Sequence, residues 1–332
     1  MRWVTRNDAV LKEGEVRLRL KAYSLTANNV SYALAGDSLG YWRFFPSQDD
    51  LWGQVPVMGV AEVSESTIGE LAVGSLVWGW FPMTDALVVE PGRMTRYGFT
   101  DVNPERGDNA AIYRRYEFFE DDELRHYRMS LKGLFTTSWL FAQSLRLERY
   151  SETKQAVLTS ASSKTALALA HELRAQNILV VGLTSGSNKR FVKETQLYDE
   201  VYSYDEVRAL SKAATVIVDF AGDSGLLDVI SEYLGDNLVH CGLIGATKNL
   251  PKKGGVLAEK RKFFFAPHAA EELAEAGLFD PSAVDRSLIE FSRWASGLVD
   301  LVTLATDAEV EQGWLDLLGN RVDPDKMLVV TR

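Results

Sequence analysis

Polar and apolar residues alternate near the start of the chain. Residues 14–21 contain EVRLRLK, in which every second residue is apolar, as in a strand with one buried face. Three further runs, 55–64, 71–80 and 85–89, are short, rich in β-branched or aromatic residues, and bounded or interrupted by glycine and proline. This pattern is typical of a compact β-barrel, so we predict that roughly the first hundred residues are mainly β-structure.

The spacing of apolar residues changes after residue 130. Residues 131–149 carry apolar side chains at intervals of three and four, which predicts an amphipathic helix and a domain boundary near residues 125–130. From the strand at 155–159 onward, strand-like runs alternate with helix-like runs such as 205–213. This repetition predicts a doubly wound parallel sheet. Beyond it we expect a strand at 262–266, helices at 268–276, 281–295 and 307–318, and a last strand at 327–331.

Chain length suggests the number of domains, and net charge limits the kinds of binding partner. The chain has 332 residues, which suggests two domains of ordinary size. Its formal charge of −10 would repel nucleic-acid phosphate and anionic lipid. We therefore expect neither a nucleic acid nor a membrane as partner.

Few residues are suited to bind metals. Cys241 is the only cysteine, which excludes an internal disulfide and a cluster of thiolate ligands. The four histidines are scattered and lack the spacing of a metal site, so we expect no metal. Residues 1–15 lack the apolar core of a signal peptide, and no apolar run approaches the roughly 18 residues that span a bilayer. We expect a cytoplasmic protein.

The turn after the strand at 155–159 is the first candidate for a ligand site. A parallel strand that leads into a helix directs backbone N–H groups and the positive helix end at a phosphate. The glycines of the usual GxGxxG motif are absent, and Ser162, Ser163, Lys164 and Thr165 occupy the turn. Their hydroxyls and the ammonium group could contact phosphate. Alternatively, Ser162 or Ser163 merely caps the helix.

The turn after the second parallel strand is basic. An NAD-dependent enzyme would carry Asp or Glu there to bind the ribose hydroxyls. Here Ser185, Asn188, Lys189 and Arg190 follow Thr184 instead. Cations and short hydrogen-bond donors suit a 2′-phosphate, which favours NADP(H). The alternative is an ordinary basic surface turn.

Several segments together resemble one known superfamily. They are GEVRLRLKAYSLTANNVSYALAGD, VPVMGVAEVSES, LAVGSLVWGW, LKGLFTTSWLF, VYSYDEV, VIVDFAGD and LVHCGLIG. Over nearly the whole chain the sequence resembles the medium-chain dehydrogenase/reductase superfamily, specifically its zinc-free quinone-oxidoreductase-like branch. More narrowly, it resembles a subgroup of that branch known only as a domain of unknown function. The sequence departs from the family pattern in its phosphate turn, where the glycines are replaced.

The resemblance implies an α/β fold in which a Rossmann domain is inserted in a GroES-like β-barrel. The barrel would comprise residues 1–128 and be completed by 298–332, and the Rossmann domain would comprise 129–297. An active site in the cleft between them, a zinc-free mechanism and a homodimer formed through the Rossmann sheet edge are also implied. The implied NADP(H)-binding residues, together with those of the basic turn, are Thr137, Ser160, Ala161, Ser162, Ser163, Lys164, Thr165, Thr184, Ser185, Asn188, Lys189, Arg190, Tyr204, Phe220, Gly222, Leu243 and Gly245.

Without zinc, hydrogen-bond donors must stabilise the negative charge that develops on a substrate oxygen. The segment 25–42 holds Thr26, Asn28, Asn29, Tyr32, Tyr41 and Trp42, at positions where related zinc-free reductases keep substrate-facing groups. We take Tyr32 as the donor or general acid and Asn29 as the residue that orients the substrate. The aromatic run GYWRFFP and Trp52 suggest an apolar or planar substrate, although such residues also fill barrel cores.

These features predict a zinc-independent, NADPH-dependent oxidoreductase that reduces an apolar carbonyl, quinone or enone. Two alternatives stay open because a fold does not determine a function. One is a catalytically silent module that binds NADP(H) or senses a ligand. The other is a lyase or isomerase that performs no redox step.

Overall fold

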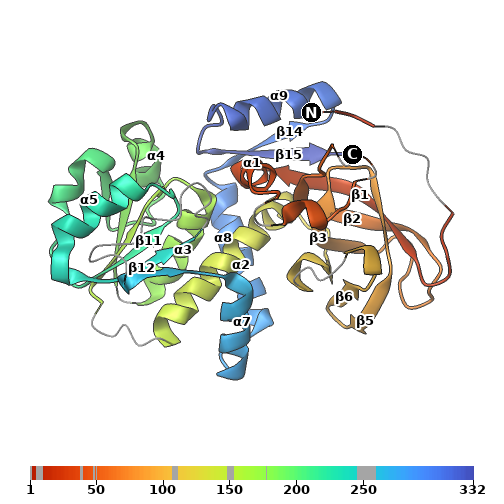
Figure 1. The fold of residues 1–332 in the computed structure, drawn as a ribbon, viewed down its shortest axis with the longest axis horizontal. Coiled ribbons are helices and arrows are strands. Elements are labelled where there is room, and N and C mark those ends of the chain that lie inside the picture. The colour runs from red at the N-terminus through yellow and green to blue at the C-terminus, as the bar shows by residue number, and fades with distance from the viewer. Residues whose placement is uncertain are drawn as a thin grey trace. The chain divides into compact units, whose positions relative to one another are not determined.

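The computed structural model describes residues 2–4, 10–37, 40–47, 49, 51–106, 111–147, 153–176, 178–244 and 259–332. The chain forms two compact units (Figure 1). Met1–Ser130 and Val299–Arg332 make the first unit, and Leu131–Leu298 makes the second. The boundary falls within a single helix, α2 (Arg125–Leu147), whose apolar spacing was the predicted helix signal.

The first unit is built on a nine-stranded sheet. Its strands are β1 (Val16–Leu25), β2 (Pro56–Ser66), β3 (Leu76–Pro82), β4 (Ala86–Val89), β5 (Pro91–Thr95), β6 (Gly98–Asp101), β7 (Arg115–Phe118), β14 (Asp300–Leu304) and β15 (Lys326–Thr331). They follow the order β14-β15-β1-β2-β3-β7-β6-β5, with β4 also paired to β1. The C-terminal β15 runs antiparallel to β1, so the two ends of the chain share one sheet.

The core of this unit is formed mainly by the side chains of its strands, among them β1, β2, β3 and β15. Val16, Leu18 and Leu20 are buried while Arg19 between them is exposed, as the alternation in β1 predicts. The helices are α1 (Ala27–Leu34) and α9 (Asp307–Leu318), with short 3-10 turns η1 (Tyr41–Arg43), η2 (Pro104–Arg106) and η3 (Ala111–Tyr113). Helix α9 lies along β14 and β15 in Figure 1, and its Val310 is fully buried.

The second unit is built on a six-stranded parallel sheet. Its strands are β8 (Gln155–Leu158), β9 (Leu179–Thr184), β10 (Glu200–Ser203), β11 (Thr215–Asp219), β12 (Leu238–Leu243) and β13 (Arg261–Phe263). Their order, β10-β9-β8-β11-β12-β13, is that of Rossmann folds. The predicted doubly wound parallel sheet is therefore confirmed. Consecutive residues of β8, β9 and β11 are buried, so both faces of these strands are covered, which explains why their sequences are mostly continuous apolar runs.

The connections of this unit are mostly helical. They are α3 (Lys164–Leu173), η4 (Arg174–Gln176), η5 (Gly186–Asn188), α4 (Lys189–Glu194), η6 (Tyr204–Ala209), α5 (Ser224–Leu234), η7 (Gly235–Asn237), α7 (Ala266–Glu275) and α8 (Pro281–Ser296). The run 205–213 was expected to be an α-helix and instead forms the short 3-10 helix η6, because Leu210 turns to an extended conformation. The strand expected at 262–266 ends at Phe263, before α7 begins.

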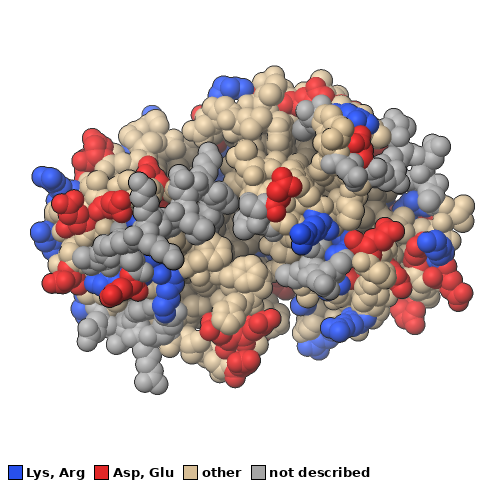
Figure 2. Space-filling view, viewed as in Figure 1, with Lys and Arg blue, Asp and Glu red and all other residues tan. Residues whose placement is uncertain are grey.

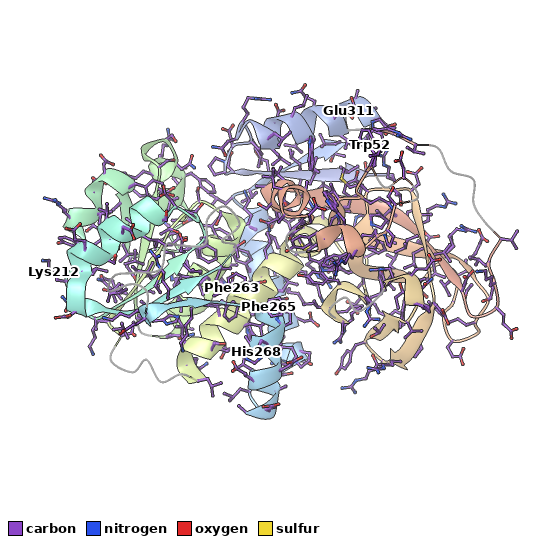
Figure 3. The ribbon with its side chains drawn as sticks, viewed as in Figure 1. Trp52, Lys212, Phe263, Phe265, His268 and Glu311 are labelled. Carbon is purple, nitrogen blue, oxygen red and sulfur yellow. The ribbon has the colours of Figure 1, made fainter. Side chains whose placement is uncertain are left out.

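The edge strand β13 carries exposed apolar side chains. Phe263 is 58% exposed, and Phe265, two residues further on, is 47% exposed (Figure 3). Unpaired edge strands with apolar residues are templates for association. Homodimerisation through this edge stays a prediction.

On the face drawn in Figure 2, acidic and basic side chains are interspersed, and the basic ones form no continuous patch. Among the helices of the described ranges, none has both the length and the apolar character needed to cross a membrane.

Candidate cofactor and substrate sites

The turn between β8 and α3 has the geometry of a phosphate-binding turn without its glycines. Ser160 has a φ of +48°, a left-handed conformation that is uncommon for a residue with a side chain. Ser163 caps α3 by accepting a hydrogen bond from the N–H of Ala166 (3.2 Å). Lys164 is the first residue of the helix and Thr165 the second. The capping role expected for Ser163 is thus present.

Three hydrogen-bonded contacts join the turns that follow β8, β9 and β10. Asn188 Nδ2 donates to Ser162 Oγ (3.0 Å), which links the second turn to the first. The hydroxyl of Tyr204 is hydrogen-bonded to Ser160, which links the third turn to the first. Lys189 Nζ donates to Glu206 Oε2, which links the second turn to the third. We call these contacts the three-turn network. It brings together predicted residues from three separate parts of the sequence.

The two predicted phosphate-binding cations already have carboxylate partners. Lys189 is paired with Glu206, and Arg190 Nε donates to Glu194 Oε1 (2.8 Å) one helical turn away. The side chain of Arg190 is 89% exposed. The cations lie where a 2′-phosphate was predicted, and a phosphate would compete with these carboxylates. Glu206 was not foreseen, because it lies in a different turn of the sequence.

A second polar centre joins the carboxyl ends of β8 and β11. Thr159 Oγ1 donates to Asp219 Oδ1 (2.6 Å) and accepts the N–H of Phe220 (2.9 Å). The N–H of Gly222 donates to Asp219 Oδ2 (3.1 Å). Thr159 is fully buried and Asp219 is 1% exposed. Burial raises the pKa of the Asp219 carboxyl, while the bonds from Thr159, Ala221 and Gly222 lower it.

This centre lies at the point where the strand order reverses, which is where ligands bind in open α/β sheets. It holds the segment 220–222, which was expected to border the nicotinamide. Gly222 has a φ of +66°, which favours glycine. The N–H of Ile244 donates to the backbone oxygen of Asp219 (2.9 Å), which ties buried Leu243, at the end of β12, to the same centre. Gly245 lies outside the described residues.

The remaining predicted cofactor residues have local partners. Thr137 Oγ1 donates to the backbone oxygen of Gly133 within α2 (3.0 Å), whereas Ser138 Oγ donates to that of Thr165 (2.8 Å). Ser138 therefore contacts the start of α3, although Thr137 was the residue expected. Ser185 Oγ lies 2.9 Å from the hydroxyl oxygen of Ser187, and Thr184 is buried at the end of β9.

Ala161 is fully buried beneath the phosphate turn. Tyr198 Oη donates to the backbone oxygen of Ala161 (2.8 Å), a contact that the sequence did not suggest. A Cβ built on Gly182 would lie 3.0 Å from Ala161 and from the Tyr198 ring, so this glycine permits the close approach of strand and turn. The backbone of the phosphate turn therefore packs against β9 and is hydrogen-bonded to Tyr198.

The chemistry of these groups fits a dinucleotide. The first N–H groups of any α-helix lack intrahelical acceptors, and α3 adds the hydroxyls of Ser162 and Ser163 at the same end. Lys189 and Arg190 supply positive charge at the neighbouring turn. Hydroxyl, N–H and cationic donors are the groups that bind diphosphate and phosphate oxygens. The donor set therefore suits NADP(H), although it lacks the usual glycines.

An aromatic cluster lies in the first unit. Its five members are Tyr32, Tyr41, Phe44, Trp80 and Tyr113. The ring centroids of Tyr32 and Tyr41 are 4.7 Å apart, and those of Phe44 and Tyr113 are 4.1 Å apart. The cluster joins α1, η1, β3 and η3, and two of the predicted tyrosines, Tyr32 and Tyr41, lie side by side in it. We call it the tyrosine cluster.

Burial keeps the three phenols of the cluster protonated. Burial, followed by the proximity of Tyr41 and Tyr113, raises the pKa of Tyr32 well above its ordinary value, and a hydrogen bond with Asn28 lowers it. Burial also raises the pKa values of Tyr41 and Tyr113, which are hydrogen-bonded to each other. The cluster is therefore a set of neutral hydroxyls that can donate hydrogen bonds.

Two predicted catalytic residues instead fix the start of α1. Thr26 is the N-cap, and its N–H donates to Asn29 Oδ1 (2.6 Å) in a reciprocal capping box. Asn29 Nδ2 donates to the backbone oxygen of Pro56 (2.9 Å), and Asn29 is 1% exposed. Both ends of its amide are thus used within the protein. Asn29 positions α1, and through it Tyr32.

Trp42 fills a slot between two glycines. A Cβ built on Gly36 would lie 1.9 Å from the Trp42 ring, and one built on Gly53 would lie 2.4 Å from it. Only glycine lets the backbone pass this close to the indole on both sides. Trp42 therefore packs within the protein next to Tyr41.

A buried ion pair supports the tyrosine cluster. Arg106 Nη1 donates to Asp101 Oδ2 (3.0 Å), and both side chains are at most 5% exposed. Arg106 Nη2 donates to the backbone oxygen of Tyr113 (2.9 Å), and Tyr116 Oη donates to that of Trp80 (3.1 Å). Burial raises the pKa of Asp101, while its hydrogen bonds and Arg106 lower it. Hydrogen bonds to the backbone oxygens of Tyr113 and Trp80 thus hold these two members of the cluster in place.

Neither of two surface hollows coincides with these groups. One, of about 620 Å³, is lined by Trp139, Arg146 and Leu278 among others, and one of about 380 Å³ is lined by Asp122, His126 and Leu301 among others. Within the described part of the chain, no group of three or more His, Cys, Asp or Glu side chains is arranged to hold a metal ion.

Solved structures share this fold. CurA from Vibrio vulnificus in complex with NADPH has a TM-score of 0.63 and 14% identity, over 98% of this chain and 93% of that one. TarJ from S. aureus in complex with NADPH has a TM-score of 0.60 and 14% identity, over 98% and 94%. The yhdH oxidoreductase from Salmonella enterica in complex with NADP has a TM-score of 0.56 and 13% identity, over 99% and 94%. The predicted fold class, a Rossmann domain with a GroES-like barrel, is confirmed.

At the level of sequence, no curated protein matches the chain. A family model described as "Protein of unknown function (DUF2855)" matches residues 23–323, which is nearly the whole chain. The protein therefore belongs to the DUF2855 family.

Proposed function

We propose that the protein is an NADPH-dependent oxidoreductase that reduces an apolar carbonyl, quinone or enone without zinc. The three-turn network carries this proposal, because it gathers hydroxyl, amide and ammonium donors at the carboxyl ends of adjacent parallel strands, where dinucleotides bind in this fold. The NADPH and NADP complexes of CurA, TarJ and yhdH support the same class of cofactor.

NADPH, when bound, supplies the hydride. Ser162, Ser163 and the first N–H groups of α3 hold the diphosphate by hydrogen bonds. Lys189 and Arg190 bind the 2′-phosphate. The segment 220–222, whose backbone is held by Thr159 and Asp219, borders the nicotinamide and is kept in one conformation by these buried bonds.

Tyr32 acts as the proton donor. Reduction of a carbonyl or enone places negative charge on the substrate oxygen, and a neutral phenol can stabilise this charge and then release its proton to it. Asn28 holds the Tyr32 hydroxyl by a hydrogen bond. The rings of Phe44 and Trp80 offer an apolar surface to a planar substrate.

Zinc independence is proposed from the supply of ligands. The sole cysteine, Cys241, is fully buried in β12, and burial raises the pKa of its thiol to about 12. A metal would require its thiolate form. Phenol hydrogens of the tyrosine cluster and the side-chain amide of Asn28 supply instead the electrophilic assistance that a metal gives elsewhere.

The proposal is tested by titration of the purified protein with NADPH and with NADH, followed by nucleotide fluorescence. We expect saturable binding of NADPH. Oxidation of bound NADPH is then measured with a carbonyl, a quinone and an enone. Absence of nucleotide binding would refute the proposal, and binding without oxidation of any panel member would support the ligand-sensing alternative.

Charge reversal of the basic turn tests the placement of the 2′-phosphate. We expect Lys189→Glu with Arg190→Glu to weaken NADPH binding by about 100-fold or more, since two charge-assisted contacts are lost and replaced by repulsion. The affinity for NADH, which lacks this phosphate, should change little. Charge reversal of Lys212, whose ammonium group makes a cation–π contact with the ring of Tyr233, is the matched control. Equal losses for both nucleotides would contradict the assignment.

A further inference from the structure

Three donors converge on one carboxylate oxygen of Glu206. Its Oε2 atom accepts hydrogen bonds from Lys189 Nζ, from the N–H of Ser203 (2.7 Å) and from Ser203 Oγ (2.7 Å). The bond from the N–H of Ser203, together with the reciprocal bond from the N–H of Glu206 to the Ser203 side chain, forms the capping box of η6. One carboxylate therefore both starts η6 and neutralises the cation at the start of α4.

This carboxylate is charged at all pH values of interest. The hydrogen bond from Lys189, followed by those from Ser203, lowers the pKa of Glu206 to about 2. The side chains of Lys189 and Glu206 are 25% and 41% exposed, so the pair is open to a ligand that approaches from solvent. A phosphate that approaches Lys189 would meet a negative charge already bound to it.

We propose that Glu206 weakens the preference for NADPH over NADH by competing with the 2′-phosphate for Lys189. This inference rests on the proposed function. For NADPH to bind, Lys189 must exchange its carboxylate partner for the phosphate, and Glu206 is left as a nearby like charge. NADH brings no phosphate, so the ion pair stays intact when NADH binds. Glu206 therefore lowers the preference for NADPH that Lys189 and Arg190 would otherwise create.

The substitution Glu206→Gln distinguishes the negative charge of this side chain from its role in the capping box of η6. Glutamine also completes a capping box, because its amide oxygen accepts the same N–H. The variant removes the negative charge beside Lys189 while it keeps the acceptor for Ser203. Glu194→Gln is the matched control, since Glu194 is also paired with a cation of the basic turn, Arg190, but takes no part in the three-turn network.

The experiment measures dissociation constants for NADPH and NADH by fluorescence titration of the wild type and both variants. We expect Glu206→Gln to bind NADPH about tenfold more tightly, equivalent to about 1.4 kcal/mol, and to bind NADH as the wild type does. Glu194→Gln should change the ratio of the two constants by less than about twofold, because Arg190 is 89% exposed, against 25% for Lys189, and solvent screens its pair with Glu194 more strongly.

A double variant tests whether the effect passes through Lys189. In a Lys189→Met background, Glu206→Gln should no longer favour NADPH. An unchanged NADPH-to-NADH ratio in Glu206→Gln, or an equal gain for both nucleotides, overturns the inference while the proposed function stands. Failure of the wild type and every variant to bind either nucleotide refutes the proposed function, and the inference falls with it.

Discussion

At the scale of single residues, the proposed chemistry depends on a phenol that stays protonated. The pKa of Tyr32 is raised chiefly by burial, and Tyr41 and Tyr113 are close enough to raise it further. A raised pKa favours the neutral form, so the donor is present throughout the neutral range and is lost only when the pH exceeds the raised value. The rate should therefore stay level on the alkaline side to at least about pH 10, the ordinary pKa of tyrosine.

Replacement of Tyr32 by phenylalanine isolates this role. We expect Tyr32→Phe to lower kcat by about 100-fold to 10,000-fold, the range for a lost general acid, and to leave NADPH affinity unchanged. Steady-state kinetics and titration measure the two effects. Tyr97→Phe, which removes an exposed hydroxyl of the same unit, is the control. A wild-type kcat in Tyr32→Phe would exclude Tyr32 as the donor.

The sequence predicted part of the tyrosine cluster. Tyr32 and Tyr41 lie close together in the chain, and both were identified. Tyr113 comes from a distant segment, and only the pairing of β3, β7 and β6 brings it there. Thr26 and Asn29 were chosen for their polar groups, but these groups complete a capping box that only the position of the helix start makes visible.

At the scale of elements, the bond between Thr159 and Asp219 fastens β8 to β11. Neither residue was among the predicted site residues, because polar residues at strand ends are common and the sequence does not state that these two strands are neighbours. The parallel pairing of Ile217 with Val157 places both strand ends together. A polar residue after each of two apolar strands is the signal that could have identified them.

Removal of the Thr159 hydroxyl tests whether its hydrogen bond with Asp219 stabilises the fold. Thr159→Val keeps the shape but removes one of the donors to buried Asp219 and leaves the N–H of Phe220 without its acceptor. We expect it to lower the free energy of unfolding by about 1–3 kcal/mol, as for other buried groups left unsatisfied. Thr159→Ser should restore most of the loss. Urea unfolding measures both, and a change below about 0.5 kcal/mol for Thr159→Val would show that the bond is not stabilising.

At the scale of the whole molecule, periodicity alone predicted most of the architecture. The alternation in 14–21 and the repeated β then α after residue 155 correspond to β1 and to the six-stranded parallel sheet. Periodicity does not specify which strands pair, so the expectation that the C-terminal segment completes the barrel came only from the resemblance, and the neighbours of β15 were not predicted. The ion pair of Lys189 and Glu206 likewise depends on how β10 follows β9 in the sheet.

The activity that we propose is hydride transfer from NADPH to a substrate. It is tested most directly with NADPH that carries deuterium at the transferable position of the nicotinamide ring, incubated with the protein and an enone, carbonyl or quinone. For an enone or carbonyl, we expect NADPH consumption with deuterium bound to carbon in the reduced product, detected by mass spectrometry. Consumption of NADPH with the enone or carbonyl but no deuterium on the product carbon, or no consumption with any of the three substrates, would contradict the proposed hydride transfer.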